Sequence, residues 1–135
     1  MLRITRDQRE KVGEPAFVER VAQHFHLFHL EIIHFLPDLV LRKRIRHGLA
    51  KGRSYGLTWE YSLTVFVAHM FRIHPEFHLQ PAIHRGLTDE AVAPDDRINT
   101  LPAIVKDSDW EEAERRGDPE AYWQAIGAPS PGRRE

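Results

Sequence analysis

The chain has no cysteine, and this absence excludes disulfide cross-links, thiolate metal sites and cysteine nucleophiles. It also has little net charge, because 19 Lys and Arg nearly balance 20 Asp and Glu to leave −1 at neutral pH. A domain that binds polyanions in general is expected to be clearly basic, so this balance argues against that class.

Long apolar runs are missing as well. The longest apolar-rich stretch, residues 25–40, is broken by histidines and by Pro37 and Asp38. A membrane span needs about 20 nearly uncharged residues, and a signal peptide needs an apolar core that the charged N-terminal segment lacks. We therefore expect a cytoplasmic protein that does not bind membranes. We expect one helical domain over residues 1–127 and a disordered tail over residues 128–135.

Apolar residues recur with a helical period in the first half of the chain. In residues 15–36 they alternate at steps of three and four, which places them on one face of a helix. Residues 38–55 repeat the pattern, and Thr58 is a suitable cap for a third helix that ends near His74, before Pro75. The three predicted stripes are Val18, Val21, Phe25, Phe28, Ile32 and Phe35; Leu41, Ile45 and Leu49; and Trp59, Leu63, Phe66, Val67 and Met70.

Glycines and capping residues mark the predicted helix contacts and ends. Gly48 and Gly52 lie beside the second stripe, where they would let another helix approach closely. Gly56 and Gly86 are suitable stops. Asp95 is a candidate cap for one or two helical turns.

Short helices are also predicted near the C-terminus. Residues 108–111 have the spacing of a capping box, and residues 118–120 begin another short helix. No run of alternating β-branched residues competes with helix. We therefore predict an all-α fold of three main antiparallel helices plus two or three short C-terminal helices, forming a bundle with a single-layer core.

Nine histidines are unusual in a chain of this length. A helical metal site needs ligands three or four residues apart, and His26 with His29 or Glu31 with His34 meet that spacing. No such pair recurs on a second helix, so we predict scattered histidines with no metal and no cofactor. A metal- or haem-binding protein that uses some of residues 24–34 and 74–84 is the alternative.

The first predicted helix is apolar on nearly every side. Leu27, Leu30 and His34 fall opposite the main stripe, and Ile33 lies between the two faces. Either the other helices wrap this one, or its second face meets a partner. The C-terminal aromatics are explained by core packing or by anchoring an interface. The predicted partner-binding residues are Leu27, Leu30, Ile33, His34, Trp110, Tyr122 and Trp123.

A basic cluster over residues 42–53 suggests phosphate contact, and hence a nucleic-acid-binding domain as a further alternative. A solvated face paired with the acidic residues of 107–120 explains the cluster better. No aromatic residues interleave with the basic ones, as a single-strand binder would need, so we predict no nucleic-acid partner. No serine has a nucleophile-elbow context and no glycine loop could cradle phosphate, so we predict no catalytic residue and no enzyme.

The segment 44–60 and the apolar helix after it resemble a set of small bacterial helical proteins. These are encoded beside spike, PAAR-tip and toxin components of type VI secretion systems. In them a helix ending in an Arg-x-Tyr-Gly-hydrophobic-Thr turn leads into an apolar helix that ends in Met-Phe. Here the turn is residues 53–58 and the ending is Met70-Phe71. The chain departs from the pattern in its histidines over 74–84. The resemblance implies an adaptor, chaperone or immunity partner of a secreted toxin or spike protein, without enzyme activity.

Overall fold

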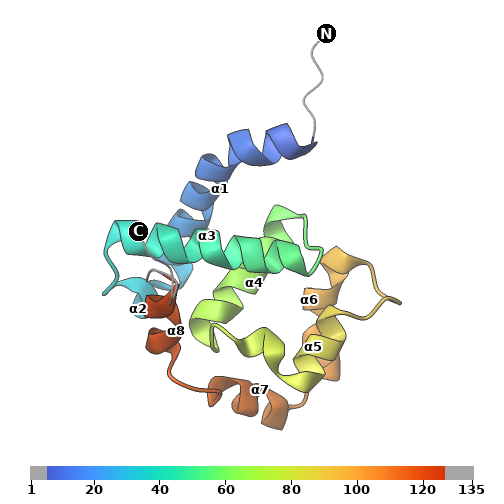
Figure 1. The fold of residues 1–135 in the computed structure, drawn as a ribbon. Coiled ribbons are helices and arrows are strands. Elements are labelled where there is room, and N and C mark those ends of the chain that lie inside the picture. The colour runs from blue at the N-terminus through green and yellow to red at the C-terminus, as the bar shows by residue number, and fades with distance from the viewer. Residues whose placement is uncertain (1–5, 127–135) are drawn as a thin grey trace, which may run out of the picture. The chain divides into compact units, whose positions relative to one another are not determined.

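The computed structural model describes residues 6–126, with side chains from Glu14 onwards. Every regular element in this range is a helix, which confirms the predicted all-α class (Figure 1). The chain divides into two compact units, Met1–Arg46 and His47–Glu135. The division falls inside the helix α3 (Asp38–Ser54). The tail predicted for residues 128–135 lies outside the described range.

The first unit contains α1 (Arg6–Phe28), α2 (Leu30–Ile33) and the start of α3. One continuous helix from Pro15 to Leu36 was predicted, and this is wrong at both ends. The helix already runs from Arg6, with Pro15 in its interior. It is also interrupted at His29, whose φ of −135° and ψ of 28° leave the helical region.

The break at His29 changes which apolar side chains are buried. The N–H of His29 still donates to the carbonyl of Phe25 at 2.8 Å, and the chain then restarts as α2. Val18, Val21 and Phe25 are buried as predicted, but Phe28 and Phe35 are 64% and 61% exposed. A stripe of six on one face needs an unbroken helix, and the chain beyond His29 no longer follows that face.

A bidentate ion pair joins α1 to α3 within the first unit. The Arg42 guanidinium donates from Nε and Nη2 to the Glu19 carboxylate at 2.5 and 2.9 Å. Its Nη1 also donates to the carbonyl of Asp38 at 3.2 Å. The hydrogen bond from Arg42 lowers the pKa of Glu19 below its usual value. The side chains of Leu41 and Ile45 on α3 are buried, as predicted.

The second unit begins with the last turns of α3, which end before Gly56 at a φ of +88°, in agreement with the predicted stop. Within this unit α5 and α4 each pack against α6, while α7 packs against η1. The elements after α3 are α4 (Glu60–Arg72), the 3-10 helix η1 (Phe77–Leu79), α5 (Pro81–Leu87), α6 (Pro94–Ile104), α7 (Asp107–Glu114) and α8 (Pro119–Ala125).

Two glycines of α3 permit the close helix approach that was predicted. A Cβ on Gly48 would lie 3.0 Å from Cγ2 of Val67, and one on Gly52 would lie 3.0 Å from Cδ2 of Leu63. Both neighbours belong to α4, and both are buried.

Gly86 has a different role from the one predicted. It lies inside α5 and is buried, so the prediction of a helix stop is wrong. A Cβ at this position would lie 2.6 Å from Cδ2 of Leu101 and 2.9 Å from Cδ1 of Ile104. The missing side chain therefore lets α5 lie directly on α6.

The start of α4 is held by a carboxylate from α6. Thr58 was predicted to cap α4, which is wrong, because Trp59 is the capping position and its side chain makes no capping bond. Instead Oδ1 of Asp95 accepts the N–H groups of Thr58 and Trp59, both at 2.8 Å. Oδ2 of Asp95 accepts the Thr58 hydroxyl at 2.7 Å. Trp59, predicted to be buried, is 59% exposed.

Asp95 was itself predicted to cap the helix that contains it. It lies instead in the first turn of α6, where Ala93 is the capping residue. Burial acts to raise the pKa of Asp95, but the bonds from Trp59, Thr58 and Ser62 outweigh it and lower the pKa below its usual value. One carboxylate thus accepts the N–H of the capping residue Trp59 and the N–H of Thr58 before it, at the start of a helix more than 30 residues earlier.

The two short C-terminal helices have carboxylate caps of their own. The capping box of α7 is formed by Lys106 and Asp109, and Oδ2 of Asp109 accepts the Lys106 N–H at 3.2 Å. The capping box predicted over residues 108–111 is therefore wrong by two positions. In α8 the cap is Asp118, as predicted, with Oδ1 accepting the N–H of Glu120 at 3.0 Å. None of the helices over residues 6–126 is both long and apolar enough to span a membrane.

Candidate interaction surface

Large apolar side chains are exposed where α1, α2 and α3 follow one another in the first unit. Leu27 and Leu39 are 76% and 80% exposed, and Phe28, Leu30 and Phe35 are each more than half exposed. Together these five side chains are called the 27–39 surface. They occur within 13 consecutive residues of the first unit. The break at His29 lies within this stretch.

The geometry of α1 explains how this surface begins. Leu27 and Phe28 lie three and four residues after His24, so the three share one face of the helix. The rings of His24 and Phe28 confirm this, with centroids 4.9 Å apart. The helix ends at Phe28, and no further turn of α1 covers these side chains.

The exposed area is large for a chain of this size. A fully exposed aromatic side chain offers roughly 150–250 Å², and a leucine side chain lies near the lower end of that range. At the observed fractions the 27–39 surface therefore presents roughly 600 Å² of apolar area. The largest apolar patch of a typical monomer measures about 300–600 Å² and is often functional. The five side chains come from three successive elements, so this figure is their summed exposed area.

Few formal charges accompany these apolar side chains. Within residues 27–39 the charged side chains are Glu31 and Asp38, and the intervening His34 lies edge-on against Phe35 with centroids 5.9 Å apart. A surface of this kind is recognised mainly through apolar contact, and both of its formal charges are acidic.

The structure separates the residues that were predicted to bind a partner. Leu27, Leu30 and His34 are exposed, and they belong to or flank the 27–39 surface. Ile33 and Trp123 are only 1% and 6% exposed, so both are core side chains that present no surface to a partner. Trp110 and Tyr122 are half-buried.

Three residues of the surface escaped the sequence analysis. The periodic stripe assigned Phe28 and Phe35 to the core, and Leu39 was not singled out. Burying Phe28 and Phe35 with the rest of the stripe required one helix through residues 15–36. No proline or glycine marks the break at His29, so the sequence carried no local signal that these side chains turn outward.

The C-terminal aromatics are part of the packing of the second unit. The hydroxyl of Tyr122 and Nε2 of His47 are 2.7 Å apart, and the rings of Trp123 and Phe71 lie 5.1 Å apart. Burial, followed by the charge of Lys51, lowers the pKa of His47. These contacts favour core packing over partner contact for Tyr122 and Trp123.

Another internal cluster joins Tyr55 to two histidines. Its hydroxyl oxygen lies 2.9 Å from Nδ1 of His78 and 3.2 Å from Nδ1 of His84. The hydroxyl has one proton, so it donates to at most one of the two imidazoles, and the carbonyl of His78 is a further acceptor at 3.5 Å. His78 is 3% exposed, and its Nε2 has no hydrogen-bond partner in the structure. Burial, followed by the charge of Lys51, lowers its pKa to about 4, so His78 is neutral at pH 7.

The remaining buried histidine is also held by backbone groups. Nε2 of His74 donates to the carbonyl of Gly117 at 3.1 Å, and Nδ1 accepts the N–H of Glu76 at 3.0 Å. Over the part of the chain that the structure describes, no three His, Asp or Glu side chains are arranged to hold a metal ion. Each of the three histidines over residues 74–84 takes part in a hydrogen bond within the second unit.

The basic cluster of α3 is partly withdrawn from solvent. Arg44 is 7% exposed, and Arg42 is engaged by Glu19. Lys43 and Arg46 are exposed. An interface for phosphates needs several accessible cations on one face, and two central members of this cluster are committed elsewhere.

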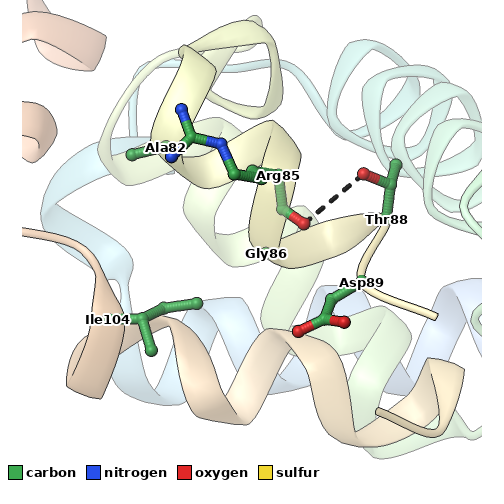
Figure 2. Close-up of a pocket in the computed structure, with 6 residues that line it drawn as sticks. All are labelled: Ala82, Arg85, Gly86, Thr88, Asp89 and Ile104. Atoms are coloured by element: carbon green, nitrogen blue, oxygen red, sulfur yellow. Dashed lines mark hydrogen bonds between the residues drawn. The ribbon is translucent and has the colours of Figure 1, made fainter. Parts of the chain in front are cut away.

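One hollow of about 460 Å³ lies between α5 and α6 of the second unit (Figure 2). The Thr88 hydroxyl donates to the carbonyl of Arg85 at 3.4 Å, the bond drawn in Figure 2. The Arg85 side chain extends beside Ala82, away from the Asp89 carboxylate (Figure 2). The lining consists of Ala82, Arg85, Gly86, Thr88, Asp89 and Ile104.

Comparison with known proteins finds no relative of this chain. No family model matches the chain, and no curated protein or solved structure matches it. The function is therefore inferred from the 27–39 surface and from the resemblance of residues 44–60.

Proposed function

We propose that this chain is a non-enzymatic protein-binding accessory of a bacterial type VI secretion effector or spike, acting as an adaptor, chaperone or immunity-type partner. It binds that partner through the 27–39 surface. The exposure of these five large apolar side chains is the observation that carries the proposal. The resemblance of residues 44–60 supplies the biological setting and the class of partner.

The size of the surface suits a protein partner. Burying roughly 600 Å² of apolar area at about 25 cal/mol per Å² contributes roughly 15 kcal/mol on this side alone. Association costs an estimated 4–15 kcal/mol in lost rigid-body freedom, with further costs for ordering side chains. Buried area does not convert to affinity in proportion, so this apolar contribution favours association and the fit of the partner sets the net affinity.

The polar groups of the second unit support a non-enzymatic role. His47, His74 and His78 each bond to a tyrosine or to the backbone inside that unit. Groups committed to structural bonds stabilise the fold, and the polar side chains of the described pocket are Arg85, Thr88 and Asp89, without a histidine among them.

Identification of the neighbouring genes is the first part of the test. Each spike, PAAR-tip or toxin protein encoded there is produced together with this chain carrying an affinity tag, and the stoichiometry of the purified complex is measured. We expect a stable complex with one of them. If no secretion component is encoded nearby, or if none binds, the proposal is wrong.

A matched pair of double variants tests the surface itself. Leu27→Gln with Leu39→Gln should weaken the complex at least tenfold, because each substitution removes more than about 1 kcal/mol of apolar burial. Leu79→Gln with Ile104→Gln is the control, because these side chains are 40% and 54% exposed in the other unit. Equal affinity in the two double variants would exclude the 27–39 surface as the binding site.

A further inference from the structure

Three side chains of the second unit bring metal-binding atoms to one place. Tyr55 directly follows α3, His78 lies in η1 and His84 lies in α5. The hydroxyl oxygen of Tyr55 lies 2.9 Å from Nδ1 of His78 and 3.2 Å from Nδ1 of His84. We propose that these three atoms bind a divalent transition-metal ion of the class that imidazoles prefer, such as Zn²⁺.

The spacing of the three atoms suits a bound ion. Zn²⁺ takes nitrogen and oxygen ligands at about 2.0–2.2 Å, so neighbouring ligand atoms of a tetrahedral site lie roughly 3.3 Å apart. Both distances from the Tyr55 oxygen are within about 0.4 Å of that separation. His84 is exposed, so its ring can turn to bring its Nδ1 toward that of His78.

The chemistry of the ligands selects the class of metal. Imidazole nitrogens suit Zn²⁺, Cu²⁺ and Ni²⁺, whereas Mg²⁺ and Ca²⁺ take oxygen ligands. Tyr55 binds as a phenolate, so its proton is released to solvent when the metal–oxygen bond forms. The negative phenolate offsets the positive charges of Lys51 and Arg116, which act on His78 and by themselves oppose a cation.

His78 is the most firmly positioned of the three ligands. It is 3% exposed, and its ring stacks on Phe66 with centroids 5.7 Å apart. Its Nε2 has no hydrogen-bond partner, and buried polar atoms without a partner are rare. The hydrogen bond to Tyr55 therefore leaves this buried ring incompletely satisfied. A metal ion on Nδ1 adds a stronger interaction to a ring whose orientation is already fixed by packing.

The exposed His84 keeps the site open to solvent. The opening gives the ion an entry path and leaves room for a water molecule as the fourth ligand. The bound ion joins the end of α3 to η1 and α5, and so stabilises the second unit. Among the described residues no three His, Asp or Glu side chains converge on an ion, so this site depends on the phenol as its third ligand.

Calorimetric titration of the chelator-treated chain with Zn²⁺ tests the site. We expect one ion per chain, with proton release seen as a dependence of the heat on the ionisation enthalpy of the buffer. His84→Gln should weaken binding at least tenfold, because loss of an outer-shell partner alone costs about 10–100-fold in metal affinity. His26→Gln is the control, since it removes an exposed histidine of α1, and it should leave the affinity within about twofold.

The phenol ligand is tested separately with Cu²⁺. A phenolate bound to Cu²⁺ gives a visible charge-transfer band, which the unmodified chain should show and Tyr55→Phe should lack. The circular-dichroism spectrum checks that Tyr55→Phe is folded. His84→Gln tests the site in any case, because it alters an exposed side chain.

Four results would overturn the site: no binding of Zn²⁺, His84→Gln binding as tightly as the unmodified chain, equal weakening by His84→Gln and His26→Gln, or a Cu²⁺ complex without the band. The site belongs to the second unit, and its occupancy does not depend on the proposed function. Failure to bind Zn²⁺ therefore leaves the 27–39 surface untouched, and failure to bind a secretion component leaves the metal site untouched.

Discussion

The two units of this chain differ in which kind of residue departs from the usual pattern of burial. The first unit exposes large apolar side chains from Leu27 to Leu39. The second unit buries polar ones, including His74, His78 and Asp95, and gives each a hydrogen bond. Buried polar groups with partners specify a fold, whereas exposed apolar groups stabilise nothing until another molecule covers them. This difference supports the proposal that the first unit carries recognition, whereas the polar contacts of the second unit stabilise its fold.

The largest loss of stability should come from removing the Asp95 carboxylate at the start of α4. Asp95→Ala deletes the acceptor of two backbone N–H groups and of the Thr58 hydroxyl. We expect a loss of about 3 kcal/mol in the free energy of unfolding by urea, as for a buried cap with several bonds. Asp96→Ala is the control, because this neighbour is exposed, and it should cost less than about 1 kcal/mol. Equal losses would show that Asp95 is not a special anchor of the second unit.

Acid should destabilise the fold through His78. The pKa of His78 is lowered from 6.5 to about 4 on folding, so between these values the unfolded chain binds the proton and the folded chain does not. The stability contributed by neutral His78 is therefore present above pH 6.5 and falls by about 3 kcal/mol as the pH drops to about 4.

His78→Gln isolates this contribution from those of other titrating groups. Urea unfolding is measured between pH 8 and about 4 for both proteins, and the variant should lose less stability across that range. The comparison concerns the slopes, so any uniform cost of the substitution does not matter. Parallel curves would show that His78 is not the group responsible.

A smaller loss of stability is expected from a substitution where α3 and α4 meet. Gly48→Ala places a Cβ 3.0 Å from Cγ2 of Val67 and 3.3 Å from Sδ of Met70. Overpacking costs about 1–3 kcal/mol, and the gain in helix propensity returns about 1, so we expect a net loss of about 1 kcal/mol. Gly117→Ala is the control, since no atom lies within 4 Å of its added Cβ. Thermal unfolding compares the two, and a stabilising Gly48→Ala would contradict the tight contact.

The smallest effect on stability should come from the 27–39 surface. Leu27→Gln and Leu39→Gln alter side chains that are 76% and 80% exposed, so each should change the free energy of unfolding by less than about 0.5 kcal/mol. Urea unfolding of each variant measures this change. A loss above about 2 kcal/mol would mean that these leucines serve the fold, which removes the contrast between the units.

Local patterns predicted the parts of the fold that local forces determine. The stripe of Leu41, Ile45 and Leu49 is buried as expected, because α3 is one unbroken helix. Gly56 and Asp118 end and begin helices as predicted, since such caps depend on the nearest residues.

Long-range contacts explain what sequence reasoning missed. Asp95 caps a helix that begins far earlier in the chain, and Gly86 is required by Leu101 of another helix. The break at His29 has no glycine or proline to announce it, so Phe28 and Phe35 were assigned to the wrong face. Two of the five side chains of the candidate surface, Leu27 and Leu30, were predicted because they departed from the main stripe.

Calorimetric titration of the secretion partner at several temperatures tests most directly whether the 27–39 surface binds protein. Burial of apolar area gives a negative heat-capacity change on binding. We predict a strongly negative change for the unmodified chain and for Leu79→Gln with Ile104→Gln, and a weaker change with at least tenfold lower affinity for Leu27→Gln with Leu39→Gln. A heat-capacity change near zero, or one that the Leu27 and Leu39 substitutions leave unaltered, would contradict recognition through this surface.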